Sequence, residues 1–298
     1  MKPFFTIIIP TYNRAHVIDQ TIQSVLDQTY TDWELIVVDD GSTDDTAIQM
    51  AKYDDPRILY YQKQHAERSA ARNYGMEQAS GSYICFLDSD DEYLPNFLSL
   101  HYEAILANPS YKVFRVGTYL VKMNERIPLP FPDPTWSALE AICRNFNGFG
   151  SYCFEREVIG EFKFIENYFV AQDFHFIFSI MHSLSGFYQV EEFGFLNNYN
   201  SNSELSKGKN IERMVLKIKV FEDLLSINNL DRNIVNLLKS RIIIVQFLIL
   251  KLFLRKIKLN YFKEITNSLG YIITHPILTI KTVLMLKVKD GHNGKVRH

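Results

Sequence analysis

Short apolar runs alternate with amphipathic helical patterns over the first hundred residues of the chain. Between the first two runs, Ile18, Ile22 and Val25 recur at the spacing that places them on one face of a helix. A second helical pattern, 69–79, separates the third run from the fourth. Because strands alternate with helices, the pattern predicts an α/β fold with a mostly parallel central sheet flanked by helices. The four β-rich runs are residues 4–9, 34–38, 58–61 and 83–87.

The pattern changes near residue 201. The stretch 201–210 is polar and turn-like, and helical periodicity follows it to about Lys289. We therefore predict two parts: an α/β domain over residues 1–204 and a mainly helical C-terminal extension over residues 205–298.

Charge divides the chain at the same place. Residues 1–204 contain 14 Lys and Arg against 28 Asp and Glu, whereas residues 205–298 contain 18 against 6. An acidic body repels nucleic acid, so no nucleic-acid partner is expected. The basic extension could rest on anionic lipid headgroups or pack on the body with its lysines solvated, and the sequence leaves both open. Its most apolar run, 242–254, has 13 residues, short of the ~18 that span a bilayer, so a transmembrane helix is not expected.

The cysteine content indicates the compartment. Cys85, Cys143 and Cys153 are odd in number and have no C-x-x-C spacing, which argues against a disulfide framework and a thiolate zinc site. The amino terminus leads directly into a strand pattern without the longer apolar region of a secretory signal. We therefore expect a cytoplasmic protein.

Polar segments follow three of the predicted strands, at residues 10–14, 39–42 and 88–92. In an open parallel sheet, ligands bind beyond the carboxyl ends of the strands. The last segment holds four carboxylates within five residues, which repel one another unless a cation lies between them. Oxygen ligands favour Mg²⁺ or Mn²⁺, which commonly combine one or two carboxylates with substrate phosphates. The segment therefore predicts a phosphorylated ligand, although an isolated D-x-D is more often a solvated turn.

Other residues near these strand ends could also contact a nucleotide. Asp39 could accept a hydrogen bond from a base N–H, as in uracil, or simply belong to an Asp-Gly turn. Arg68 and Arg72 lie four apart near the start of a helical pattern and could donate to phosphate oxygens or form an exposed basic face. Neither G-x-G-x-x-G after the first strand nor a P-loop motif occurs, so a dinucleotide or P-loop cradle is not indicated.

Taken in order, these motifs resemble those of the family 2 glycosyltransferases, enzymes of the Rossmann-like GT-A fold. The resemblance is close over residues 4 to about 98 and thinner to about 203. It implies transfer of a sugar from a nucleotide-diphosphate donor, usually a UDP-sugar, with inversion at the anomeric carbon. The motifs that carry it are residues 10–14 (PTYNR), 37–44 (VVDDGSTD), 70–75 (AARNYG) and 81–91 (GSYICFLDSDD).

The resemblance also implies roles for individual residues. Asp88 and Asp90 would form the D-x-D motif that holds Mn²⁺ or Mg²⁺, with Asp90 the favoured direct ligand. The catalytic base would be Asp173, which could alternatively cap the following helix. The segment 198–200 reads Asn-Tyr-Asn where the family often has Tyr-Arg-x-His, so acceptor contacts are not carried over there. The implied nucleotide-sugar site comprises Pro10, Thr11, Tyr12, Arg14, Asp39, Arg68, Arg72, Asp88 and Ser89.

We therefore expect a metal-dependent, inverting hexosyltransferase with a UDP-sugar donor and a glycan or lipid-linked acceptor. Its setting would be bacterial surface polysaccharide synthesis, with the basic extension at the inner face of the cell membrane. Two alternatives stay open: a polyprenyl-phosphate sugar transferase and a catalytically silent nucleotide-sugar binding module. A nucleotidyltransferase would need a Gly-rich first loop, where this chain has residues 11–14 instead. The sequence identifies neither sugar nor acceptor, and an oligomer is compatible with it.

Overall fold

The computed structural model describes residues 2–146, 148–184, 186–199 and 211–256. The chain divides into two compact units, residues 1–241 and 242–298. The predicted boundary between residues 204 and 205 lies outside the described residues. The first unit extends past it to Arg241 and so includes helix α8 (Ile211–Leu225). This helix was expected in the extension, but its Phe221 ring packs on Phe174 of the first unit, with 5.4 Å between ring centroids.

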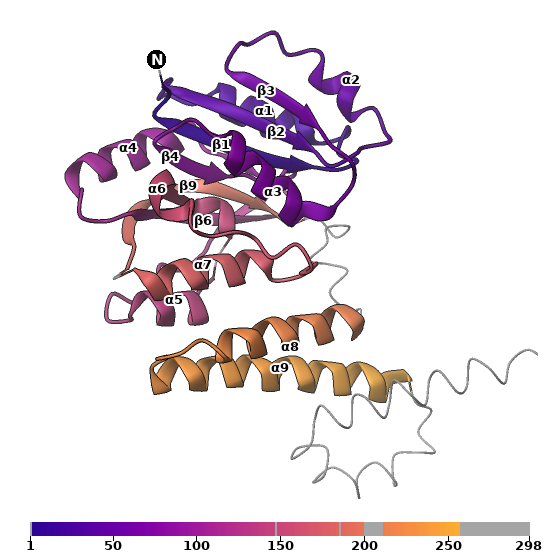
Figure 1. Ribbon diagram of the computed structural model, residues 1–298, viewed down its shortest axis with the longest axis vertical. Helices are drawn as coiled ribbons and strands as arrows, with labels where there is room; N and C mark the ends of the chain where they lie inside the picture. Colours follow the sequence, from indigo (N-terminus) through magenta and orange to yellow (C-terminus); the bar gives the residue numbers. More distant parts are fainter. Residues whose placement is uncertain (1, 147, 185, 200–210, 257–298) are drawn as a thin grey trace, which may run out of the picture. The chain divides into compact units, whose positions relative to one another are not determined.

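One mixed sheet forms the centre of the first unit (Figure 1). Its nine strands in the described residues are β1 (Phe5–Thr11), β2 (Trp33–Asp39), β3 (Ile58–Gln62), β4 (Tyr83–Phe86), β5 (Glu92–Tyr93), β6 (Val113–Lys122), β7 (Glu125–Pro128), β8 (Tyr152–Glu155) and β9 (Tyr188–Asn198). Across the sheet they follow the order β3-β2-β1-β4-β8-β6-β9-β5, and β7 pairs with β6.

The half of the sheet that the first hundred residues build is parallel. Strand β1 pairs with β2 and β4, and β2 pairs with β3. Thr11 at the end of β1 lies beside Asp39 at the end of β2, so the loops after both strands begin at one edge. The other half is mixed, because β8 is antiparallel to β4 and β6 while β9 is parallel to β6. The α/β prediction is confirmed, but parallel pairing dominates only the first half.

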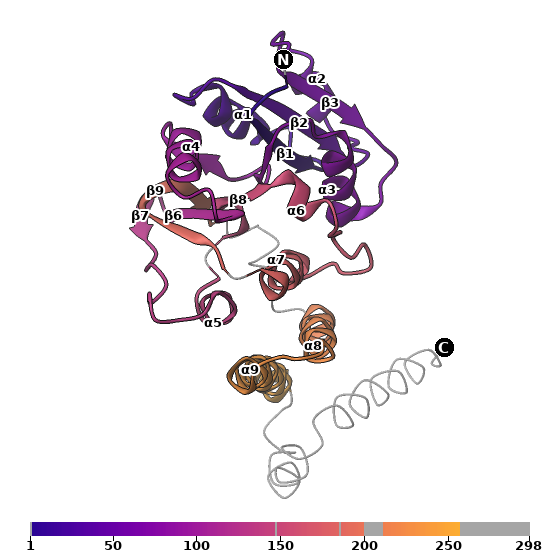
Figure 2. The ribbon, with the colours of Figure 1, turned by 60° about the vertical axis from the view of Figure 1, so that its left-hand side comes forward.

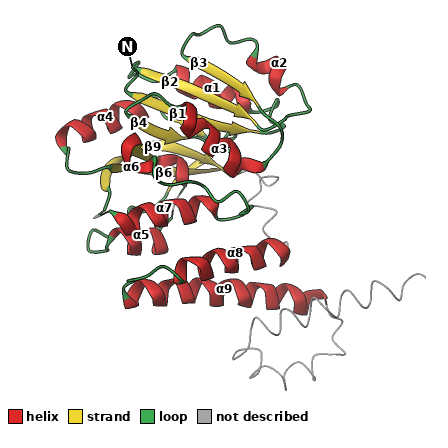
Figure 3. Cartoon of the chain, in the orientation of Figure 1, coloured by secondary structure: helices red, strands yellow, loops and turns green. Residues whose placement is uncertain are grey.

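Helices cover both faces of this sheet (Figure 3). In the views of Figures 1 and 2, α8 lies alongside α7 (Gln172–Ser183). The remaining helices of the described residues are α1 (Ile18–Leu26), α2 (Thr46–Met50), α3 (Glu67–Gln78), α4 (Phe97–Ala107), α5 (Ala138–Arg144), α6 (Arg156–Ile159) and α9 (Arg232–Lys256), with a 3₁₀ turn at Phe149–Ser151.

The central strand β1 is buried along its whole length, as expected for a strand covered on both faces. Ile7 points into the core that α1 and α4 cover, and Ile8 points to α3 on the opposite face. On α3, Gly75 allows a close approach, since a Cβ there would lie 2.5 Å from Cγ2 of Ile8. This approach fixes α3 over the end of the sheet where the polar segments begin.

Helix α9 is longer than its apolar run suggested. Its segment Arg232–Lys251 has a mean hydropathy of 1.6 and is, by length and composition, sufficient to cross a membrane. The apolar run of residues 242–254 is only part of this helix, which begins at Arg232. Core helices of soluble proteins pass the same test, so length and composition do not by themselves assign a membrane span.

Candidate active site

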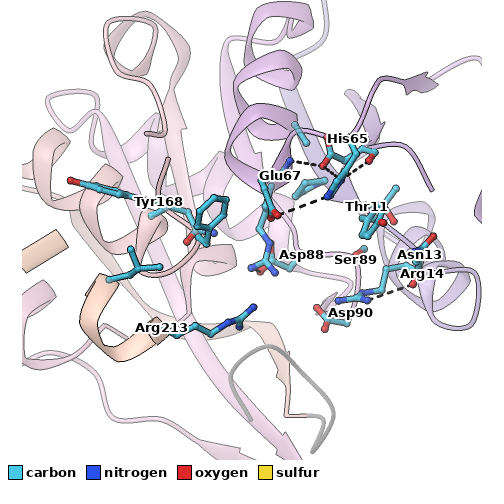
Figure 4. A pocket seen from close by; sticks show the side chains of 18 of the residues that line it. Thr11, Asn13, Arg14, His65, Glu67, Asp88, Ser89, Asp90, Tyr168 and Arg213 are labelled. Atoms are coloured by element: carbon cyan, nitrogen blue, oxygen red, sulfur yellow. Dashed lines mark hydrogen bonds and ion pairs between the residues drawn. The ribbon is translucent and has the colours of Figure 1, made fainter. Parts of the chain in front are cut away.

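A cavity of about 520 Å³ opens beyond the carboxyl ends of β1, β2 and β4 (Figure 4). It has two walls, built from different parts of the chain. The strand-end wall combines the loops after the three strands with the start of α3. Its residues are Pro10, Thr11, Tyr12, Asn13, Arg14, Asp40, His65, Glu67, Arg68, Ala71, Asp88, Ser89 and Asp90.

The helical wall comes from the segment before α7 and from α8. Tyr168 ties the two together, because its hydroxyl donates to the carboxylate of Asp223 on α8. Phe169 is 50% exposed, which leaves an aromatic ring open to the cavity. Figure 4 shows Arg213 of α8 and the acidic residues of the strand-end wall facing the same space. The residues of this wall are Tyr168, Phe169, Gln172, Glu212, Arg213 and Leu216.

Most of the predicted site residues reach this cavity. The carboxylates after two strands do meet at one edge, as the sequence argument required. The exceptions are Asp39, Arg72 and Asp173, which do not line it. Those that do are Pro10, Thr11, Tyr12, Arg14, Arg68, Asp88, Ser89 and Asp90.

Asp39 is buried and turned away from the cavity. Its carboxylate accepts hydrogen bonds from the backbone N–H of Ser42 at 2.8 Å and from the Tyr60 hydroxyl at 2.5 Å. Burial and this hydrogen bond raise the pKa of Tyr60. Asp39 does not line the cavity, and its contact with a nucleobase stays a prediction; its neighbour Asp40, also buried, is the residue that borders the cavity.

Asp40 holds the loop that leads into α3. Its carboxylate accepts from the backbone N–H groups of Ala66 at 3.0 Å and Glu67 at 2.7 Å. It also pairs with Lys63 Nζ at 3.0 Å and His65 Nδ1 at 2.7 Å. The His65 ring then lies on the ring of Tyr12, with centroids 4.3 Å apart and 21° between planes. One carboxylate thus shapes the aromatic corner of the cavity.

The acidic turn after β4 gives each carboxylate a different environment. Asp88 pairs with Arg72 at 2.5 Å and with Arg68 at 3.9 Å. Desolvation opposes these arginines, but together they lower the pKa of Asp88. For Asp90, desolvation and the nearby Asp88 raise the pKa. For Asp91, burial, Asp88 and Asp90 raise the pKa well above its ordinary value.

Arg72 acts from behind the cavity wall. Its side chain is 1% exposed, and its guanidinium lies about 5 Å from the rings of Phe149 and Phe164. Its ion pair with Asp88 is its link to the cavity. The four-residue spacing predicts that Arg72 contacts a nucleotide together with Arg68, but Arg72 is buried and only Arg68 of the two lines the cavity.

Asp173 lies in the first turn of α7, next to the cavity but not on its surface. Its neighbour Gln172 is the residue that lines the cavity. Asp173 Oδ1 accepts from the backbone N–H of Phe174 at 2.8 Å. Burial and the charge of Arg241 lower the pKa of Lys217 on α8, and the charge of the Asp173 carboxylate opposes that shift. The helix begins at Gln172 with Ala171 as its cap, so the alternative of Asp173 as the cap is wrong.

The carboxylates of Asp88 and Asp90 are the candidates for binding a metal ion at the cavity. Within the described ranges, no group of three or more His, Cys, Asp or Glu side chains is assembled that could hold one. Asp90 reaches the cavity and has no ion-pair partner among the residues described, whereas Asp88 is engaged by arginines. Because Mg²⁺ and Mn²⁺ are often bound by one or two carboxylates with waters and substrate phosphates, this donor set fits a cation that the substrate helps to complete.

Sequence reasoning missed several residues of the cavity. Asn13 and Asp40 lie inside the quoted motifs and could have been included, because both follow strands whose neighbours were chosen. The helical wall had no comparable signal, since its residues come from two segments at least 40 positions apart with no shared pattern. The packing of α8 on α7 and the contact between Tyr168 and Asp223 bring Arg213 to the same cavity as Asp90.

Comparisons with known proteins give a consistent family. Residues 6–151 match the model of glycosyl transferase family 2. The Escherichia coli UDP-Glc:alpha-D-GlcNAc-diphosphoundecaprenol beta-1,3-glucosyltransferase WfgD is 35% identical over 161 residues, covering 53% of this chain and 63% of that one. A Campylobacter jejuni GalNAc(5)-diNAcBac-PP-undecaprenol beta-1,3-glucosyltransferase is 32% identical over 178 residues, 56% of each chain. The chain spans less than two thirds of the length of these relatives.

Solved structures confirm the architecture. Staphylococcus aureus TarS 1-349 in complex with UDP-GlcNAc superposes with a TM-score of 0.70 at 20% identity, covering 91% of this chain and 80% of that one. The mannosyltransferase PcManGT from Pyrobaculum calidifontis gives a TM-score of 0.61 at 16% identity, with 95% and 84% covered. At these identities the likeness concerns the fold. The chain has the GT-A fold, and its residues 6–151 match glycosyl transferase family 2.

Proposed function

We propose that the protein is an inverting glycosyltransferase that moves a sugar from a UDP-sugar to a glycan or lipid-linked acceptor in bacterial surface polysaccharide synthesis. The observation that carries the proposal is the cavity where Asp40, Arg68 and Asp90 converge from three separate segments. The names of the E. coli and C. jejuni relatives describe glucosyl transfer to undecaprenol-linked acceptors, and TarS was crystallised with UDP-GlcNAc. These support a nucleotide-sugar donor and a lipid-linked acceptor.

The strand-end wall offers the groups that a UDP-sugar needs. Tyr12 presents an aromatic face for a base, and Asp40 holds the loop that places His65 against the Tyr12 ring. Arg14 and Arg68 supply forked donors for the diphosphate. Arg72 keeps Asp88 ionised beside them. In this arrangement the chain's own side chains bind the donor and orient its leaving group.

A Mn²⁺ or Mg²⁺ ion held by Asp90 and Asp88 would supply Lewis-acid stabilisation of the departing diphosphate. For the base we propose Asp173, one residue beyond Gln172 in the wall. Its carboxylate would take the proton of the acceptor hydroxyl as the new bond forms. That role requires the first turn of α7 to present Asp173 to the acceptor, and Asp173→Asn tests it through loss of turnover with UDP binding retained.

Release of UDP from a panel of UDP-sugars tests the donor and the metal together. We expect turnover by the wild-type protein with MnCl₂, loss of turnover in EDTA, and a fall of about a hundredfold or more in Asp90→Ala. Equal turnover by Asp90→Ala and wild type would remove the metal role. Stabilisation by UDP without turnover of any donor would identify the silent binding module, and transfer to a polyprenyl phosphate alone would identify that class of acceptor.

We also propose that α9 brings the protein to the membrane surface. Ile243, Ile244, Phe247 and Leu248 are exposed at helical spacing on α9, and the exposed Lys251 continues the same face. Exposed apolar side chains beside basic residues are typical of helices that lie in the interface of anionic membranes. This contact would place the active site near lipid-linked acceptors.

A further inference from the structure

The turn after β4 contains Asp88, Asp90, Asp91 and Glu92, and four carboxylates so close together repel one another. The structure separates them by giving different partners to three of the four. Asp88 is held by Arg72, and Asp91 is buried with its oxygens turned towards the end of β9. Asp90 alone reaches the cavity without an ion-pair partner among the residues described. The contacts that hold this turn therefore decide that Asp90 reaches the cavity and that Asp91 and Glu92 do not.

The last residue of β9, Asn198, makes contacts with three consecutive residues of this turn. Its side-chain Nδ2 donates to the backbone carbonyl of Asp90 at 3.0 Å and to Glu92 Oε1 at 2.9 Å. Its backbone N–H donates to Asp91 Oδ1 at 2.8 Å. Asn197 adds a longer hydrogen bond of 3.3 Å to Asp91 Oδ2.

These contacts use the full donor capacity of Asn198. An asparagine has two side-chain N–H bonds and one backbone N–H, and here each has an acceptor in the turn. The pairing of β5 with β9 places Glu92 beside Leu196, which keeps Asn198 at the same position along the turn. The Asp90 backbone is therefore fixed on one side, while its carboxylate projects to the other, into the cavity.

We propose that Asn198 is a positioning residue that fixes the backbone of Asp90 and holds the carboxylates of Asp91 and Glu92 out of the cavity. The inference rests on the proposed function, since it concerns how one carboxylate is presented to the cation and diphosphate of a nucleotide-sugar. It also explains the residue types: a donor is needed at position 198, because an acid there would face Glu92 and the Asp90 carbonyl with no proton to offer.

A double-mutant cycle between Asn198→Asp and Asp90→Ala tests this role. Asn198→Asp keeps the shape of the side chain but removes both donors. We expect it to lower kcat/KM for UDP release by about tenfold to a hundredfold, as misplacement of a catalytic group by about 1 Å does. If Asn198 acts through Asp90, the double variant is no worse than Asp90→Ala, because the two changes remove the same interaction.

Two readings accompany kinetics: the UDP-induced rise in melting temperature with and without MnCl₂, and the melting temperature without ligand. Asn108→Asp is the matched control, since Asn108 donates to Ala104 at the end of α4, away from the cavity. Asn108→Asp should keep kcat/KM within about twofold of wild type and leave both melting-temperature readings close to those of wild type. If Asn198→Asp fails to fold, Asn198→Ala and Asn198→Ser, which keep the backbone N–H to Asp91, enter the same cycle.

Independent, multiplying losses in the double variant would overturn the inference, as would wild-type behaviour of Asn198→Asp. Either result leaves the proposed function standing, provided that the wild-type protein releases UDP. A wild-type protein that is neither stabilised by UDP nor active on any UDP-sugar would instead refute the proposed function, and the inference with it. The wild-type readings therefore separate the two failures.

Discussion

At the scale of single residues, chemically identical neighbours have opposite surroundings. Asp39 lies inside the protein with Tyr60 and Ser42, whereas Asp40 holds the entrance loop of α3 and lines the cavity. The difference comes from the direction in which each side chain leaves the end of β2. Both carboxylates are therefore bound within the fold, but only Asp40 borders the site.

This difference predicts separate effects for two matched variants. Asp39→Asn should lower the free energy of unfolding by about 1–3 kcal/mol, because an amide satisfies the Tyr60 hydroxyl and the Ser42 N–H less well than a carboxylate. The UDP affinity of the folded protein should stay within about twofold. Asp40→Asn should release residues 63–67 and weaken UDP binding by about tenfold. Denaturant titration and calorimetric UDP binding measure the two effects, and the reverse assignment would restore Asp39 as the residue that contacts the base.

A second residue-scale prediction concerns His101, which is completely buried on α4 against the ring of Phe97. Burial lowers the pKa of His101 from 6.5 to about 3, so the folded state keeps the ring neutral while the unfolded state takes up a proton below pH 6.5. Stability is therefore complete above pH 6.5 and falls as the pH drops. Between pH 7.5 and pH 5 this histidine should account for a loss of about 2 kcal/mol.

Replacement of the ring separates this contribution from other groups. In His101→Phe, the fall in unfolding free energy between pH 7.5 and pH 5 should be smaller than in wild type by about 2 kcal/mol. His16 is exposed and serves as the control, because His16→Gln should leave the slope unchanged. Parallel curves for wild type and His101→Phe would show that His101 takes up its proton in the folded state.

At the scale of elements, helix α3 links packing to the site. It lies against β1 through Gly75 and carries Arg68 and Arg72 towards the acidic turn. The distance of α3 from the sheet sets where these guanidinium groups lie. A change at the contact with β1 therefore shifts them relative to the cavity. The arginines thus depend on a residue that never touches a ligand.

Gly75→Ala tests this dependence. The new Cβ would lie 2.5 Å from Cγ2 of Ile8, so α3 must move away from β1. We expect a loss of about 1–3 kcal/mol in stability and weaker UDP binding. Ile8→Leu removes the methyl group on Cβ, so the double variant should recover part of both losses. Gly160→Ala is the control, because its nearest atom would lie at an ordinary 3.4 Å.

The elements also show how far the sequence predicts this fold. The parallel strands β1 to β4 and helices α1 and α3 follow from regular periodicity, because β1, β2 and β4 are buried on both faces and each helix is buried on one. The strands from β6 to β9 could not be predicted in this way. Gly117, Phe193 and the bulges between β6 and β9 interrupt the alternation of apolar and polar residues. The helical wall of the cavity depends on long-range packing, such as Phe174 on Phe221, which no local pattern encodes.

At the scale of the whole molecule, charge and apolar surface are segregated along the chain. The acidic residues belong mainly to residues 1–204 and the basic excess to residues 205–298. The exposed apolar residues of α9 lie within the basic part. Because an anionic membrane attracts basic segments, this distribution supports the proposal that α9 mediates membrane binding.

Flotation of the full-length protein with vesicles tests membrane binding. We expect recovery with vesicles that contain phosphatidylglycerol, an anionic lipid, and little with vesicles of phosphatidylcholine alone. Ile243→Gln/Phe247→Gln removes apolar area from the exposed face of α9 and should weaken binding by about tenfold or more, while UDP binding is retained. Asn233→Gln/Asn236→Gln alters exposed positions nearer the start of the same helix and should bind as wild type.

Salt distinguishes the contributions to this binding. Raising the ionic strength from about 0.1 M to 1 M shortens the Debye length from about 10 Å to 3 Å, so recovery with anionic vesicles should fall. Binding that survives both high salt and alkaline carbonate would mean that α9 spans the bilayer instead of lying on it. Equal, weak recovery with both lipids would mean that the apolar face of α9 is covered within the protein, and the proposed membrane contact would be wrong.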